Sequence, residues 1–159
     1  MKEQIKGYYR FLFWQQWLFY TSLLFALFGL VLALYGNNPL FEPYHRMLAS
    51  IFFQQDSLPE DTRLLYTFVM GPMGATIAVT YILLAYMARY PFRRREKWAR
   101  NAIIVGFSVW FITDAIVSIT YGVYFQALVL HLLISIPQKA LPLIFTWKAF
   151  HQDHHKRPD

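Results

Sequence analysis

Four long apolar runs dominate the pattern of residues along this chain. They cover about residues 11–35, 64–89, 101–123 and 126–148. Each run reaches the ~20 residues that an α-helix needs to cross the hydrocarbon of a bilayer, and each is far longer than a membrane β-strand. Because backbone polar groups inside a bilayer must be satisfied within the protein, we expect an all-α polytopic membrane protein with a four-transmembrane-helix bundle.

The first run follows three basic residues, an arrangement that also occurs in secretory signals. The apolar core of a signal has about 7–15 residues, and this run is longer, so we expect it to be retained as a transmembrane helix. The chain contains no repeat, low-complexity segment or Gly/Ser linker. Residues 1–159 are therefore predicted to form a single membrane domain.

The loop between the first and second runs is the only one with room for structure. GNNP at residues 36–39 ends the first helix, and over residues 43–55 apolar side chains recur at helical spacing on one face. These side chains are Tyr44, Met47, Leu48, Ile51 and Phe52. We expect a short amphipathic helix on the outer side of the membrane, followed by a capping box at SLPE, residues 57–60, that opens the second helix.

The basic residues predict how the chain is oriented. Twelve of the 15 Lys and Arg residues lie at the two chain ends and in the second loop: Lys2, Lys6, Arg10, Arg89, Arg93, Arg94, Arg95, Lys97, Arg100, Lys148, Lys156 and Arg157. The first loop holds only Arg46 and Arg63, and the third loop holds none. By the positive-inside rule, both termini are expected in the cytoplasm.

Composition narrows the classes of partner. Hydrophobic residues make up 57% of the chain and charged residues 15%, far from the balance of a soluble domain. The net charge of +6 would suit nucleic acid, but the basic residues lie beside the ends of the apolar runs, where they meet anionic headgroups. We therefore expect membrane lipids and no nucleic acid as partners. The absence of cysteine excludes disulfides and thiol chemistry.

The position of the charged residue Asp114 inside an apolar run needs an explanation. It lies inside the apolar stretch WFITDAIVSITYGVYF, residues 110–125. At 1.5 Å rise per residue, its place in the third run is about 3 Å from the membrane midplane. A carboxylate at that depth costs about 2.5–3.5 kcal/mol on insertion scales, so it is expected to face the bundle interior and to find a partner or carry a proton.

The fourth run offers partners for this carboxylate. His131, Ser135, Gln138 or Lys139, and Pro142 recur at helical spacing and form one polar stripe. Asp114 falls between His131 and Lys139 in depth, so either an ion pair with Lys139 or a hydrogen bond with His131 is expected. Pro137 and Pro142 each free a backbone carbonyl, which at membrane depth is tolerated where it faces protein or a cavity.

These features predict a ligand-binding pocket with Asp114 at its polar end. Its candidate residues are polar or aromatic: Asp114, His131, Lys139, Gln138, Ser135, Trp110, Ser118, Tyr121, Thr76 and Thr80, with Thr113 and Thr21 as further lining. The alternative is that Asp114 holds helices together through nearby hydroxyl groups and that Lys139 extends to the headgroups. GPMGAT, residues 71–76, predicts either close packing of a neighbouring helix or a kink.

Other chemistry has little support in the pattern. HQDHHK, residues 151–156, is similar to the histidine boxes of membrane di-iron enzymes, but a solvated basic tail is the favoured interpretation and no metal site is predicted. The chain shows no Ser/His/Asp set, phosphate loop or pair of acids. We therefore assign no catalytic residue and no cofactor.

One resemblance adds an expectation. GPMGATIAVTYILLAYMARYPFRRREKWARNAI, WFITDAIVSITYGVYFQ and ALPLIFTWKAF, within residues 70–150, resemble small uncharacterised four-span membrane proteins of bacteria. The chain is also similar in size and span count to DoxX-like and EXPERA-like four-helix membrane proteins. This resemblance implies a bacterial inner membrane and a lipid-like ligand held between helices near a membrane acid, here Asp114.

Three functions remain as alternatives. The first is binding of a hydrophobic small molecule, such as an isoprenoid, quinone, sterol-like lipid or carotenoid. The second is a non-catalytic subunit or homo-oligomeric scaffold of a membrane complex. The third is a proton- or ion-coupled carrier or channel in which Asp114 titrates, which the lack of an inverted repeat disfavours.

Overall fold

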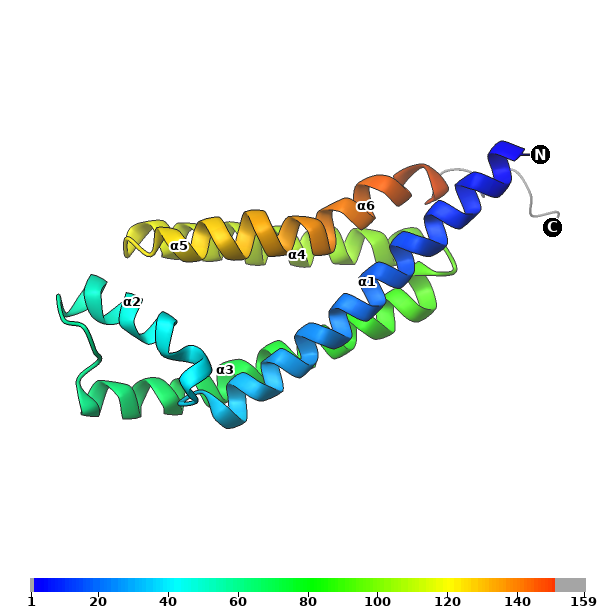
Figure 1. The fold of residues 1–159 in the computed structure, drawn as a ribbon. Coiled ribbons are helices and arrows are strands. Elements are labelled where there is room, and N and C mark those ends of the chain that lie inside the picture. Colours follow the sequence, from blue (N-terminus) through cyan, green and yellow to red (C-terminus); the bar gives the residue numbers. More distant parts are fainter. Residues whose placement is uncertain (1, 151–159) are drawn as a thin grey trace. The chain divides into compact units, whose positions relative to one another are not determined.

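The computed structural model describes the backbone of residues 2–150, and every element in that range is helical (Figure 1). Side chains are described for residues 5–150, except those of residues 127, 130 and 132. The expected all-α class is confirmed. The chain divides into two compact units: unit 1 contains Met1–Ser22 and Leu83–Asp159, and unit 2 contains Leu23–Ile82.

Three long helices carry the first three apolar runs. They are α1 (Lys2–Tyr35), α3 (Glu60–Met87), which the short π-helix η2 (Ala88–Phe92) extends, and α4 (Lys97–Thr120). The segments Ile5–Tyr35, Glu60–Phe92 and Lys97–Thr120 are long and apolar enough to cross a membrane. The helices begin nine, four and four residues before the predicted runs, because the polar residues in front of each run are already helical. An integral membrane protein follows from these three helices.

The fourth apolar run is helical but not a regular α-helix. It consists of α5 (Tyr124–Gln126), η3 (Ala127–Ala140), α6 (Leu141–Thr146) and η4 (Trp147–Phe150). The segment η3 is a π-helix of 14 residues with Pro137 inside it, and it packs along α4 (Figure 1). π-helical turns are rare and are often found at functional sites. The predicted crossing at residues 126–148 stays a prediction.

In unit 2, α1 and α3 meet at two glycines. A Cβ atom on Gly29 would lie 2.6 Å from the backbone nitrogen of Ala78 and 2.8 Å from the carbonyl oxygen of Gly74. A Cβ atom on Gly74 would lie 2.5 Å from the backbone nitrogen of Ala33. Neither site has room for a side chain, so the small residues let two backbones touch. The close-packing interpretation of GPMGAT is confirmed at Gly74.

The first loop contains the expected short helix. The Asn38 side chain accepts a hydrogen bond from the Leu40 N–H at 3.0 Å and opens η1 (Pro39–Phe41), after which α2 runs over Glu42–Phe52. Arg63 connects this loop to α3, the helix to which Arg63 belongs. It donates to Asn37 Oδ1 at 2.6 Å and to Glu42 Oε2 at 3.2 Å.

The residues of α2 differ in how deeply they are buried. The residues of α2 that are buried are His45 and Ala49, whereas Ile51 and Phe52 remain exposed. The buried His45 ring packs edge-on against Tyr66, with 4.8 Å between ring centroids.

The capping box predicted at SLPE is wrong. The helix α3 begins at Glu60, and its first backbone hydrogen bond runs from the Arg63 N–H to the Pro59 carbonyl at 2.8 Å. Ser57 is therefore too far from the first turn to cap it. Two acids in that turn, Glu60 and Asp61, favour the start of the helix through its dipole instead.

Candidate functional site: the polar cluster at Asp114

A tight turn brings the partner residues back to Asp114. The helix α4 ends at Thr120, and Gly122 adopts a φ of +73°, a left-handed conformation that residues with a Cβ rarely take. The Val123 N–H then donates to the Ser118 carbonyl at 2.8 Å and closes the turn. The chain reverses, and η3 runs back along α4.

The first contact of Asp114 comes from just beyond this turn. Gln126 Nε2 donates to Asp114 Oδ1 at 3.0 Å. Gln126 is not among the site residues predicted from the sequence. The signal that could have identified it is Gly122, since a tight reversal there places residues 114 and 126 at the same height on two antiparallel helices.

His131 provides the second contact. Its Nε2 atom lies 3.5 Å from Asp114 Oδ2 and 3.1 Å from the Phe111 carbonyl oxygen. A carbonyl oxygen can only accept, so Nε2 must carry the hydrogen. The same hydrogen faces Asp114 Oδ2 at a longer distance. Of the two partners expected for Asp114, His131 is therefore in contact with it.

Aromatic rings surround the histidine. Trp110 stacks on His131 with ring centroids 5.3 Å apart and an interplanar angle of 19°, and Phe111 lies 4.4 Å away. Lys139 is farther along the same stripe. Its ammonium lies 4.9 Å from the centroid of the Trp110 ring and 5.3 Å from that of Phe107, as in cation–π contacts. The expected ion pair between Asp114 and Lys139 stays a prediction.

The other predicted site residues divide into three groups. Ser118, Ser135 and Gln138 are buried in unit 1, as a polar stripe facing protein should be. Tyr121 and Thr113 are exposed. The remaining residues donate to backbone carbonyls one turn earlier on their own helices: Thr76 to Pro72, Thr80 to Thr76, and Thr21 to Trp17. Thr76 and Thr80 belong to unit 2.

The prolines of the fourth run free a carbonyl, and α1 supplies its donor. The Leu141 N–H donates to the Ile136 carbonyl, five residues back, in the π-helical register. The next N–H in this register would reach the Pro137 carbonyl, but residue 142 is proline and has no N–H. Trp17 Nε1 donates to that carbonyl at 3.1 Å. The carbonyl that Pro142 frees thus faces protein, as predicted; the same prediction for Pro137 stays a prediction.

Among Asp114, Gln126 and His131, the three residues of the polar cluster, two buried atoms lack a hydrogen-bond partner in the described part of the chain. They are Asp114 Oδ2 and His131 Nδ1. The Asp114 side chain is 21% exposed, so the carboxylate lies near the surface of the helix pair, whereas the His131 side chain is only 3% exposed. Buried polar atoms without a hydrogen-bond partner are costly, and each of them calls for a physical reason.

The described residues contain no cluster of side chains arranged as metal ligands. Among residues 2–150, no group of three or more His, Cys, Asp or Glu side chains is close enough to hold a metal ion. The segment HQDHHK at residues 151–156 lies outside the described residues.

Comparisons of this chain with protein families, with curated proteins and with solved structures find no match. Any function therefore has to be inferred from the residues themselves.

Proposed function

We propose that the chain is an integral membrane protein that binds a lipid-like small molecule, with Asp114 at the polar end of the ligand. The single observation that supports this proposal best is the state of Asp114 Oδ2, which has no hydrogen-bond partner and only a 3.5 Å contact with His131 Nε2. A donor group on a ligand would complete the hydrogen bonding of this oxygen.

The proposal includes a membrane arrangement. The chain crosses the bilayer four times, with both termini in the cytoplasm of a bacterial cell, as the distribution of Lys and Arg favours. In this arrangement Asp114 lies about 3 Å from the midplane, at 1.5 Å rise per residue. Water is scarce at that depth, so the donor has to come from protein or from a hydrophobic molecule.

The hydrogen-bond pattern narrows the class of ligand. Gln126 and His131 supply the donors of the cluster, and Asp114 supplies the acceptor that is left over. A molecule with a hydroxyl group, such as an isoprenoid alcohol, a quinol or a sterol-like lipid, fits this acceptor better than a carbonyl compound or a hydrocarbon. Trp110, which is 40% exposed and stacked on His131, offers an apolar surface beside the polar end.

Native mass spectrometry of the wild-type protein and of Asp114→Asn, with extraction of bound molecules, tests the proposal. Asparagine keeps the size of the side chain but replaces one carboxylate oxygen with a donor. We expect a stoichiometric hydroxyl-bearing molecule in the wild type and its loss from the variant. Asp61→Asn, in the first turn of α3, is the control and should retain the molecule. Equal ligand content in all three proteins would exclude Asp114 as part of a binding site.

A second function, a homo-oligomeric scaffold, is favoured by one face of α4. This face presents β-branched residues at alternating spacings of four and three, each of them at least 57% exposed: Val105, Val109, Ile112, Ile116 and Ile119. This is the spacing of a seam between two helices, and it suits the same helix of a second copy of the chain. Replacement of Val109 and Ile112 by bulky Phe should reduce the oligomer to the monomer if the seam exists. An unchanged mass of the complex would exclude the seam.

A further inference from the structure

Arg100 is a cation held almost completely away from water. It lies in the first turn of α4 and is 6% exposed. Its Nε and Nη2 atoms donate to the side-chain oxygen of Asn101 at 3.2 and 3.0 Å. The guanidinium carbon lies 4.1 Å from the centroid of the Trp147 ring and 5.3 Å from that of Phe150. None of these three contacts carries a negative charge.

The hydrogen-bonding groups of the Arg100 guanidinium are not all satisfied. Its Nη1 atom is buried and has no hydrogen-bond partner in the described residues. A buried charge is ordinarily paired with an opposite charge, because cation–π contacts and one amide oxygen replace only part of its lost hydration. The geometry around Arg100 therefore points to an anion that reaches Nη1.

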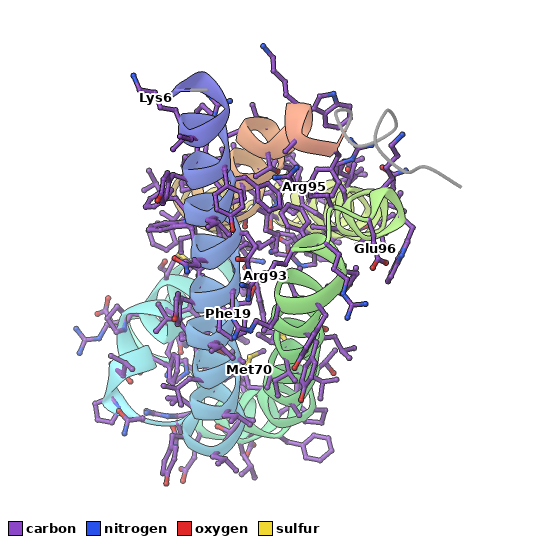
Figure 2. The ribbon with its side chains drawn as sticks, turned by 90° about the vertical axis from the view of Figure 1, so that its right-hand side faces the viewer. Lys6, Phe19, Met70, Arg93, Arg95 and Glu96 are labelled. Carbon is purple, nitrogen blue, oxygen red and sulfur yellow. The ribbon has the colours of Figure 1, made fainter. Side chains whose placement is uncertain are left out.

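A second arginine is held beside the same group of rings. Phe11, Phe92 and Phe150 form a cluster with centroid distances of 4.9–6.1 Å, and the Arg95 guanidinium lies 5.0 Å from the Phe11 centroid. Arg95 has a φ of +58°, an uncommon conformation for a residue with a side chain. It lies with Arg93 and Glu96 at the turn before α4 (Figure 2). Two guanidinium groups thus contact members of one ring cluster.

We propose that Arg100, with Arg95 nearby, binds the phosphate of an anionic phospholipid. A phosphate presents several acceptor oxygens to a planar guanidinium, and arginine is the side chain best suited to recognise it. Trp147 is 47% exposed although it contacts Arg100. Trp98, which lies with Arg100 in the first turn of α4, is 59% exposed. Half-exposed indoles beside basic residues are typical of the headgroup level of a membrane, where such a lipid lies. The site does not depend on the ligand proposed for Asp114.

Titration of the delipidated full-length protein with phosphatidylglycerol, followed by native mass spectrometry, tests this site. Phosphatidylcholine and inorganic phosphate are the two comparison probes. We expect phosphatidylglycerol to bind more tightly than phosphatidylcholine, and Arg100→Gln to weaken its binding by about tenfold or more, as loss of charged hydrogen bonds implies. Arg94→Gln is the control in the same basic segment, because its side chain is 74% exposed; it should leave the affinity unchanged.

Arg100→Lys covers the case in which Arg100→Gln does not fold. It keeps the charge but removes the planar fork, so it should also bind phosphatidylglycerol more weakly than the wild type. Wild-type affinity in either folded variant would overturn the proposal. Tighter binding of inorganic phosphate than of phosphatidylglycerol would overturn it as well, because the site would then hold a free anion. Asp114→Asn should leave this affinity unchanged, which separates the site from the one at Asp114.

Discussion

The contact between Gly29 and Gly74 gives the sharpest test of how unit 2 is held together. In the variant Gly74→Ala, the new methyl group would lie 2.5 Å from the Ala33 nitrogen, 2.6 Å from the Gly29 carbonyl oxygen and 2.9 Å from the Ala33 Cα. All three atoms belong to the backbone of α1, so none can move away by a change of rotamer. The two helices have to separate, and the packing around them has to loosen.

The size of the effect follows from two opposing contributions. Overpacking of a close contact costs about 1–3 kcal/mol, and three backbone neighbours place this site toward the upper end. Alanine is also a better helix former than glycine by about 0.8–1.0 kcal/mol, which opposes that cost. Gly106→Ala on α4 isolates this second contribution, because nothing lies within 4 Å of the Cβ that it would add. We expect Gly74→Ala to be less stable than Gly106→Ala by about 1–3 kcal/mol.

The free energy of unfolding in mixed detergent micelles, followed by circular dichroism, measures this difference. Gly29→Ala should behave like Gly74→Ala, because its Cβ would approach the same pair of backbones. The double variant should cost less than the sum of the two, since one separation of the helices relieves both contacts. Equal stability of Gly74→Ala and Gly106→Ala would refute the close approach of α1 and α3.

Three further substitutions test other contacts. Trp17→Phe keeps an aromatic ring but removes the donor to the Pro137 carbonyl, so it should lower the free energy of unfolding by about 1–3 kcal/mol. Trp14→Phe is the control and should lower the free energy of unfolding by less, because the contact of Trp14 with Phe145 is ring stacking. Gly122→Ala puts a Cβ on a residue with a φ of +73° and should cost about 1–2 kcal/mol by the same measurement, although its surroundings are open. Arg63→Ala removes both contacts to the first loop; hydrogen exchange of the α2 amides should become faster while that of α4 stays the same.

The fold class could be read from the sequence because the apolar runs alone decide it. A run of about 20 apolar residues in a bilayer can form only a helix. Three helical segments long and apolar enough to cross a membrane lie where the sequence predicts spans, and their ends differ from the predicted ends by up to six residues. The break after Tyr35 was also predictable, since GNNP combines a glycine, two asparagines and a proline. These signals are local: each can be read without knowing which other segment of the chain packs against it.

The candidate site was only partly predictable for the opposite reason. The cost of an acid at membrane depth identified Asp114, and helical spacing identified His131 as one of two partners. Which partner makes contact depends on the turn at Gly122 and on the π-helical register of η3, and both are set by tertiary packing. The residues of the predicted stripe are all buried, but the contacts that each of them makes could not be derived from α-helical spacing alone.

Gln15 and Trp17 connect these observations, because the two side chains leave α1 in nearly opposite directions. Residues two apart on an α-helix are separated by about 200°, at 3.6 residues per turn. Gln15 is 2% exposed and donates to the Ala88 carbonyl of η2 at 3.0 Å, and Trp17 donates to the Pro137 carbonyl of η3. In unit 1, α1 therefore lies between two π-helical segments and satisfies one carbonyl of each. A glutamine inside an apolar run thus has a structural reason, and the helix that carries His131 is fixed at its irregular point by a donor from α1.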